Sequence, residues 1–181
     1  APHQWSSPAP SHRGPNPSPP ARKIPAVPTA RVPLAGAYGQ LFRFGTVAWT
    51  LAIDPWTSRS FVLAVDLSDP AAPAVRGRLD LPDTGTGAWW WNAGAVQAGG
   101  ALAVLRVGWT CGAVCTSEAE LLVLDLRDAD APRLAATVPL PRRAWTSGLA
   151  AVGTDVWYSQ YDWVEQQPDG AVRYLVGRVE L

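Results

Sequence analysis

The chain has 181 residues with 15 basic and 15 acidic side chains, so its formal net charge is zero. Residues 1–33 contain four of the basic residues and no acid, which leaves 11 basic against 15 acidic residues, a charge of 11 − 15 = −4, in residues 34–181. A body of that charge lacks the basic surface that binds phosphate backbones, and no apolar run reaches the roughly 18 residues of a membrane helix, so we expect neither a nucleic-acid partner nor a membrane span.

The first predicted segment is a proline-rich tail, residues 1–33. It holds 10 of the 18 prolines and both histidines, His3 and His12. Such a composition buries too little apolar surface to offset the entropy of ordering, so it predicts a disordered linker. The alternative is an extended ligand for an aromatic groove on another protein.

Two apolar runs separated by a turn follow in the first part of the body. "SFVLAVDL" (60–67) reads as a strand, "SDPAAP" as a turn in which Asp bonds to its own backbone and Pro presets φ, and "AVRGRLDL" (74–81) as a second strand. Pro82 ends the second strand and places it at the edge of a sheet, because proline cannot donate to a ladder.

The same hairpin recurs 59 residues later, as "AELLVLDL" (119–126), "RDADAP" and "RLAATVPL" (133–140), which Pro141 ends. Fainter echoes join "TVAWT" (46–50) to "RVGWT" (106–110), and "AGAVQAGGALAV" (93–104) to "SGLAAVGTDVWY" (147–158), with the Gly-Gly and Gly-Thr turns in register. Trp49, Trp109 and Trp163 recur at matching places near strand ends. The chain finishes with "YLVGRVEL", which matches the first strand of the hairpin.

These repeats predict units of four short strands and very little helix. We place the units at about 34–82, 88–141 and 145–181, the third ending after its third strand. Tandem four-stranded antiparallel units are typical of β-propeller blades, so the expected fold class is all-β, an incomplete β-propeller of about two and three-quarter blades. A closed ring needs about 4 to 8 blades, so we expect either a fragment of a longer chain or edges paired by other copies. Two stacked sheets are the alternative.

The hairpins carry a family resemblance. "VLAVDLSDPAAPAVRGRLDLP" and "LLVLDLRDADAPRLAATVPLP" resemble the hairpin of LVIVD-type β-propeller repeats, with the closest match at Asp66, Ser68, Asp69, Pro70 and Pro73. The second copy departs from the pattern, with Arg127 for Ser, Ala129 for Pro and no Gly at the place of Gly77. The resemblance implies a secreted, periplasmic or cell-surface bacterial protein that serves as a scaffold or adhesion module.

Catalytic chemistry is poorly provided for in the body. Residues 34–181 contain no histidine, which excludes Ser-His-Asp and Cys-His catalysis and histidine metal sites there. We therefore assign no catalytic residue, no cofactor and no metal. A hydrolase that uses carboxylates alone is the less favoured alternative, and no motif distinguishes a pair among the acids Asp155, Asp162, Glu165, Glu118 and Glu120.

Cys111 and Cys115 are separated by three residues in "WTCGAVCTSE". A tight turn would bring them within disulfide range, and an oxidising compartment would favour that bond. Two free thiols, in an intracellular protein, and metal or redox chemistry are the alternatives.

Five aspartates stand at the repeated turns, and we predict that they cap these turns. The alternative is calcium binding, but the spacing lacks the dense ladder of acids of calcium loops. The five are Asp66, Asp69, Asp125, Asp128 and Asp130.

Tryptophan is abundant, with 10 in the chain and three in a row at Trp89, Trp90 and Trp91. In a strand these side chains alternate between faces, so Trp90 points away from its neighbours. Packing between blades is one interpretation, and an exposed platform for a carbohydrate or peptide is the other. The sequence thus predicts a non-catalytic interaction or scaffold module with an unknown protein or glycan ligand.

Overall fold

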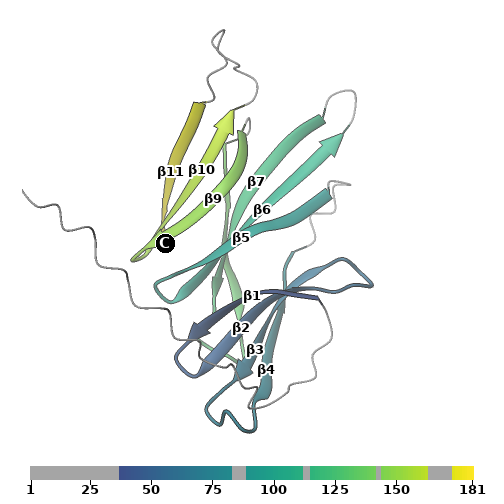
Figure 1. Cartoon of the computed structure of the whole chain (residues 1–181), viewed down its shortest axis with the longest axis vertical. Coiled ribbons are helices and arrows are strands. Elements are labelled where there is room, and N and C mark those ends of the chain that lie inside the picture. Colours follow the sequence, from purple (N-terminus) through teal and green to yellow (C-terminus); the bar gives the residue numbers. More distant parts are fainter. Residues whose placement is uncertain (1–36, 83–88, 112–114, 142–143, 163–172) are drawn as a thin grey trace, which may run out of the picture.

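The computed structural model describes residues 37–82, 89–111, 115–141, 144–162 and 173–181. All of the regular secondary structure in these ranges is β-strand, arranged in three antiparallel sheets of four, four and three strands. Figure 1 shows the sheets following one another in chain order. Among the described residues there is no helix with the length and hydropathy of a transmembrane segment.

The first two sheets have the same simple up-and-down order. The first sheet runs β1-β2-β3-β4, with the strands Ala37–Phe44, Val47–Ile53, Ser60–Asp66 and Ala74–Asp80. The second runs β5-β6-β7-β8, with the strands Trp89–Ala98, Ala101–Cys111, Cys115–Asp125 and Arg133–Pro139. β4 and β8 lie at sheet edges, which confirms the edge positions predicted from Pro82 and Pro141.

The third sheet has three described strands in the order β11-β10-β9. They are Ala144–Val152 (β9), Asp155–Asp162 (β10) and Arg173–Glu180 (β11). The predicted all-β class is therefore confirmed, and three successive sheets of four, four and three strands are consistent with a partial β-propeller. The alternative of two stacked sheets is wrong. The proline-rich tail lies outside the described residues.

In each sheet a two-residue turn joins the first two strands of the unit. β1 and β2, β5 and β6, and β9 and β10 are joined by turns whose first residue is Gly45, Gly99 or Gly153. All three glycines have positive φ, of 61°, 57° and 64°, a conformation that side chains other than glycine rarely adopt. The predicted correspondence of the Gly-Gly and Gly-Thr turns is thus confirmed, and it sets the register of each unit.

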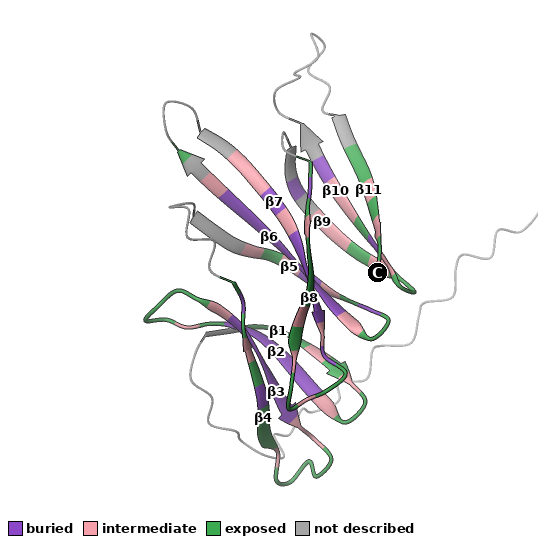
Figure 2. Cartoon of the chain, turned by 180° about the vertical axis from the view of Figure 1, so that it is seen from behind, coloured by how far each residue is buried: buried purple, intermediate pink, exposed green. Residues whose placement is uncertain are grey.

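The second sheet packs on both of its neighbours. Alternate side chains of β7 go to opposite faces, so Leu122 and Leu124 join the core shared with the first sheet while Leu121 joins the core shared with the third. Figure 2 shows the buried residues concentrated along the middle strands β2, β3, β6 and β7. The nearly continuous apolar sequence of these strands follows from burial on both faces.

The register corrects one sequence inference. Trp49 is the third residue of β2, whereas Trp109 is the ninth residue of β6, so the two do not occupy matching places. The residues that match Trp49, third after the hairpin turn, are Ala103 and Trp157. The predicted packing between sheets nevertheless holds for Trp49, which is fully buried in the core between the first two sheets. Trp163 lies outside the described residues.

Candidate functional site

The repeated aspartates cap their turns, as predicted. Ser68 donates its backbone N–H to Asp66 Oδ1 at 2.8 Å, and Ala71 donates to Asp69 Oδ1 at 2.9 Å. The second copy repeats the pattern. The backbone N–H of Arg127 donates to Asp125 Oδ1 at 3.3 Å, and that of Asp130 donates to Asp128 Oδ1 at 3.0 Å. Among the described residues no group of three acids, cysteines or histidines is placed to hold a metal ion.

The outer part of the first junction between sheets is held by ion pairs. Arg76 on β4 donates Nε to Asp130 Oδ1 at 2.6 Å, and Asp130 belongs to the turn of the next sheet. The same guanidinium donates Nη1 to Asp66 Oδ2 at 3.0 Å. These bonds hold the pKa of Asp130 below its usual value, and with the stronger effect of the Ser68 N–H they do the same for the pKa of Asp66. The turn aspartates therefore join neighbouring sheets as well as capping turns.

Gly77 permits the close approach of the same turn. A Cβ built at Gly77 would lie against the carbonyl oxygen of Ala129 and 2.9 Å from Cδ of Pro132. Separations this short do not occur between real atoms, so any side chain at this position forces the two sheets apart. The glycine that belongs to the hairpin pattern is thus explained by the packing of the following unit.

Replacing Gly77 with alanine should destabilise the protein by about 1–3 kcal/mol, because the new methyl group overpacks the junction. The matched control is Gly94→Ala on β5, since a Cβ there meets nothing within 4 Å. Urea unfolding of both variants measures the difference. A Gly77→Ala variant as stable as the control would show that the turn does not pack on β4.

The inner part of each junction repeats one hydrogen bond to a proline carbonyl. Arg106 on β6 donates Nη1 to the carbonyl oxygen of Pro82 at 2.6 Å. At the next junction, Gln160 on β10 donates Nε2 to the carbonyl oxygen of Pro141 at 3.2 Å. The two donors match in register, each being the sixth residue of its strand. The Leu-Pro that closes each hairpin thus provides the acceptor for the following sheet.

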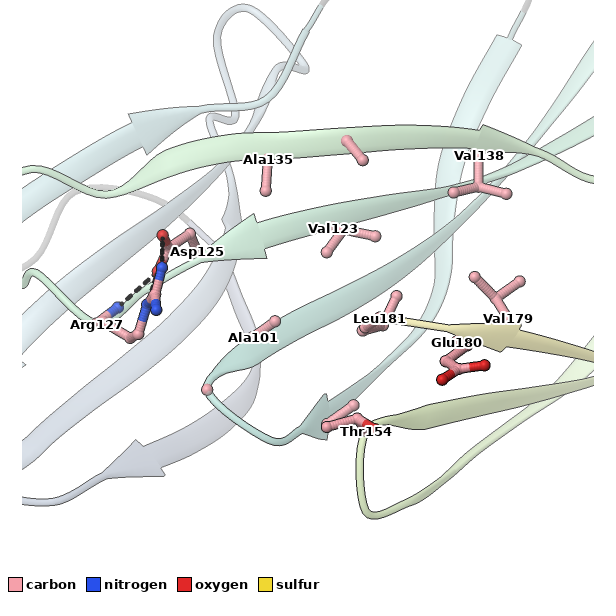
Figure 3. Close-up of a pocket in the computed structure, with 13 residues that line it drawn as sticks. Ala101, Val123, Asp125, Arg127, Ala135, Val138, Thr154, Val179, Glu180 and Leu181 are labelled. Carbon is pink, nitrogen blue, oxygen red and sulfur yellow. Dashed lines mark hydrogen bonds and ion pairs between the residues drawn. The ribbon is translucent and has the colours of Figure 1, made fainter.

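The second junction contains a cavity where the first has a turn. A cavity of about 500 Å³ lies between β8 and the end of β11, and Figure 3 shows Ala135 and Val138 on one side with Val179 and Leu181 on the other. Ala136, which matches Gly77 at a distance of 59 residues, also lines it. At the first junction the corresponding place is occupied by Ala129 and Pro132.

One side of the third sheet presents apolar side chains to solvent beside the ion pairs of Arg178 with Asp155 and Glu180. Trp157 faces Ala150 and Arg178 across the sheet, on the side opposite Val156, which is buried against the second sheet. Val152 and Val176 share the exposed side by register, and each is 69% exposed. Trp157 is 37% exposed, whereas its counterpart Trp49 is 0% exposed. The face that packs on a following sheet in the first two units is therefore uncovered in the third, among the described residues.

Asp125 is a second charged centre at the rim of the cavity. The guanidinium groups of Arg127 and Arg133, together with the backbone N–H of Arg127, hold the pKa of its carboxyl far below the usual value. Arg127 Nε lies 2.8 Å from Asp125 Oδ1, and Arg133 Nη2 lies 2.9 Å from Oδ2.

The lowered pKa values of Asp66, Asp125 and Asp130 predict a loss of stability in acid. As the pH falls through about 4, the unfolded chain takes up protons that these folded carboxylates do not, so the free energy of unfolding decreases until the folded groups are protonated too. Urea midpoints measured at about pH 7, 4 and 3 should fall along the series, and an Asp66→Asn, Asp125→Asn variant should show a smaller fall. Equal midpoints in the wild-type protein would contradict the assigned contacts.

The predicted aromatic and cysteine sites are placed only by their backbone. Trp89, Trp90 and Trp91 open β5 and lie opposite Trp109, Gly108 and Val107, but their side chains lie outside what the structure describes. Cys111 and Cys115 are direct partners at the ends of β6 and β7. Direct partners have Cα atoms about 4.5–5.5 Å apart, which suits a disulfide. Both sites stay predictions.

The carboxylates considered for hydrolysis are only partly described. Glu120 accepts a hydrogen bond from Arg106 Nε at 2.9 Å, and Asp155 lies 3.0 Å from Arg178 Nη2. Glu118 lies on β7 opposite Gly108. The side chain of Asp162 and the whole of Glu165 lie outside the described residues. The structure thus ties Glu120 and Asp155 to arginines rather than to each other.

Comparison with protein families finds no match for this chain, and comparison with curated proteins finds none either. The contacts between sheets are the structural features that sequence reasoning missed. The available signal was Gly77, present in the first hairpin and replaced by Ala136 in the second. A glycine in the middle of a strand often marks the close approach of another backbone, and here that backbone belongs to the next turn.

Proposed function

We propose that the chain is a non-catalytic β-propeller interaction or scaffold module of a secreted or cell-surface protein. The observation that carries the proposal is the uncovered face of the third sheet, where Val152, Trp157 and Val176 are exposed on one side. Apolar side chains grouped in this way mark a surface that another protein covers. The partner of this face is a further blade, supplied by a longer chain or by another copy.

The repeat geometry supports a blade as the partner of this face. On the first sheet the matching residues include Trp49 and Val62, both 0% exposed against the second sheet. On the second sheet they include Ala103 and Leu121, both 0% exposed and packed against the third sheet. This face packs on the following sheet in each of the first two units, so the same face of the third sheet is suited to pack on a further sheet.

The resemblance to LVIVD-type repeats supports the location outside the cytoplasm. The first hairpin carries the pattern at Asp66, Asp69 and Pro73, and the caps of Asp66 and Asp69 supply a physical reason for the two acids. The cross-strand placement of Cys111 and Cys115 suits an oxidising compartment as well. Both observations concern the compartment and leave the ligand open.

A photoreactive residue at position 157 tests the proposal. The full-length protein carrying benzoylphenylalanine in place of Trp157, produced in its native host, should cross-link to a peptide of another β-sheet unit, identified by mass spectrometry. The same residue in place of Trp56, which is 92% exposed in the loop between β2 and β3, is the matched control. Cross-linking at position 157 no stronger than at position 56 would overturn the proposal.

A second candidate function is carbohydrate or peptide binding by Trp89, Trp90 and Trp91. It is favoured by the run of three consecutive aromatic residues that opens β5. In the ladder the backbone partner of Trp90 is Gly108. Loss of ligand retention on a glycan or peptide array in Trp90→Ala, with unchanged thermal unfolding, would establish this function.

A further inference from the structure

A cavity of about 350 Å³ opens at the first junction, beside the strands that begin the first and second sheets. Leu51 and Ile53 line it from the first sheet, and Asn92 and Gly94 line it from the second. β1 and β5 are edge strands, at the opposite side of their sheets from β4 and β8 (Figure 1). This cavity is therefore separate from the cavity of the second junction and from the uncovered face of the third sheet.

The carboxamide of Asn92 lacks one hydrogen bond. Its Nδ2 donates to Ser60 Oγ at 2.9 Å, while its Oδ1 is buried and has no partner among the described residues. Rotating the amide does not remove this deficit, because the hydroxyl of Ser60 can donate as well as accept, and Nδ2 would then be the unpaired atom. A ligand group that both donates and accepts, such as a hydroxyl, satisfies either orientation. Because an unpaired buried amide destabilises the folded state, this position favours the binding of a hydroxyl compound.

The third sheet satisfies the corresponding group within itself. By register, Asn92 lies opposite Arg106, and Thr146 lies opposite Gln160. Gln160 donates Nε2 to Thr146 Oγ1 at 3.0 Å, so the pair of the third sheet is hydrogen-bonded across the ladder. In the second sheet Arg106 donates Nε to Glu120 Oε1 at 2.9 Å, and Asn92 Oδ1 stays without a partner. The unpaired acceptor is thus a particular feature of the second sheet and not of the repeat.

The cavity is bounded by a β-bulge on each of the two edge strands. The bulge of β1 contains Gly39 and Gln40, and that of β5 contains Ala93; all three lack a partner in the ladder, line the cavity and are exposed. Bulge residues leave backbone groups outside the ladder, and the Gln40 carbonyl oxygen accepts instead from Thr50 Oγ1 at 3.3 Å. The remaining groups can bind a ligand. The bulges also interrupt the regular edge that an added peptide strand would need, which favours a compact ligand.

We propose that this cavity binds one sugar unit of a neutral carbohydrate. None of the described residues that line it is charged, so an ionic ligand would lose hydration without gaining a counter-charge. A sugar has hydroxyl groups for Asn92 and for the bulges, and C–H groups for Ile53, which is 41% exposed. A volume of this order suits a small ligand held by a few polar groups on an apolar wall. The inference does not rest on the proposed function, because the site belongs to the first two sheets.

Glycine keeps the cavity open on both strands. A Cβ built at Gly94 meets nothing within 4 Å, and one at Gly39 meets only the carbonyl oxygen of Leu51, at 3.8 Å. Gly148 corresponds to Gly94, since each precedes the glycine of its turn by five residues, but a Cβ at Gly148 would overlap Ser159 Oγ. A side chain introduced at position 94 therefore enters open space, where it blocks the ligand without displacing a neighbour.

Titration with three neutral sugars tests the site in the full-length protein. Methyl α-glucoside, methyl α-galactoside and methyl α-mannoside are added separately, and amide chemical shifts are followed by NMR. At least one of them should bind with a Kd of about 1 mM and shift the amides of Gln40, Ala93 and Gly94. The absence of saturable shifts with all three sugars, or shifts confined to other strands, would overturn the proposal.

Three variants separate the contact from the fold. Asn92→Ala and Gly94→Val should each weaken the binding by about tenfold, with thermal unfolding that shows a folded protein. Ser60→Ala is the matched control, because it removes the same bond to Asn92 but keeps the carboxamide, and it should bind within about threefold of the wild type. Equal losses in Asn92→Ala and Ser60→Ala, or unchanged binding in Gly94→Val, would overturn the site. The cross-link at position 157 concerns the third sheet, so the proposed function stands or fails separately from these results.

Discussion

Replacing Trp49 with alanine is expected to lower the free energy of unfolding by about 3–5 kcal/mol, the largest effect of any single substitution considered for this protein. Trp49 is fully buried among the side chains that join the first two sheets, including Leu51, Val62 and Leu102. The truncation removes apolar contact and leaves a cavity that two packed sheets cannot collapse to fill. Thermal or urea unfolding of the purified variant measures the loss.

Two further variants separate the causes of that loss. Trp56→Ala should be neutral within about 0.5 kcal/mol, because Trp56 is 92% exposed. Trp49→Phe should cost less than Trp49→Ala, because the ring is kept and the buried Nε1, which has no hydrogen-bond partner among the described residues, is removed. A Trp49→Ala variant no less stable than Trp56→Ala would contradict the packing of the first two sheets.

Replacing Glu120 with alanine has the second largest expected effect, a decrease of about 3 kcal/mol in the free energy of unfolding. Glu120 forms an ion pair with Arg106, and the two side chains are only 16% and 7% exposed. Arg106 still donates to the carbonyl oxygen of Pro82, but it loses its ion pair with Glu120 in a poorly solvated position. Because this arginine connects the first two sheets, the loss should appear in the unfolding of the whole body.

The matched variant replaces both members of the pair. Arg106→Met with Glu120→Leu removes the buried charge altogether, and such exchanges are often neutral or stabilising. We expect this double variant to unfold at a higher urea concentration than Glu120→Ala alone. A double variant that is less stable than the single one would show that the loss in Glu120→Ala comes from packing and not from an unbalanced charge.

The strands of this protein could be predicted because their signals are local. The hairpins at residues 60–82 and 119–141 combine apolar runs with Asp and Pro turns, and the structure places a strand pair at each. Pro82 and Pro141 mark edge strands because the missing N–H excludes an inner position. Turn capping by Asp66 and Asp125 likewise depends on neighbours only two residues away.

The register and the contacts between sheets could not be predicted in the same way. Trp49 and Trp109 stand in similar pentapeptides, but β6 is longer than β2 and carries Trp109 beyond the place of Trp49. The pair of Arg76 and Asp130 joins residues 54 positions apart, and the sequence around either residue does not indicate its partner. Such pairs follow from how the sheets stack, which a local pattern does not contain.

The candidate sites show the same difference between local signals, which could be predicted, and contacts between sheets, which could not. The sequence aligns Ala136 with Gly77, but the reason for the glycine could not be predicted, because it lies in the turn of the next sheet that packs on Gly77. The exposed face of Val152, Trp157 and Val176 could not be read at all, because the same residue types are buried in the first two units. Exposure at this face depends on the absence of a neighbouring sheet among the described residues, not on composition.

Among the described residues the third unit is an open copy of the first two, and residue-level amide hydrogen exchange tests this most directly. In the dilute full-length protein, the amides of β3 and β7 should all be protected, because both strands lie between two neighbours. Alternate amides of β11 should exchange rapidly, because one edge of that strand is unpaired among the described residues. Equal protection of every amide in β3, β7 and β11 at the lowest measurable concentration would contradict the open third unit, as would rapid exchange of alternate amides in β3 or β7.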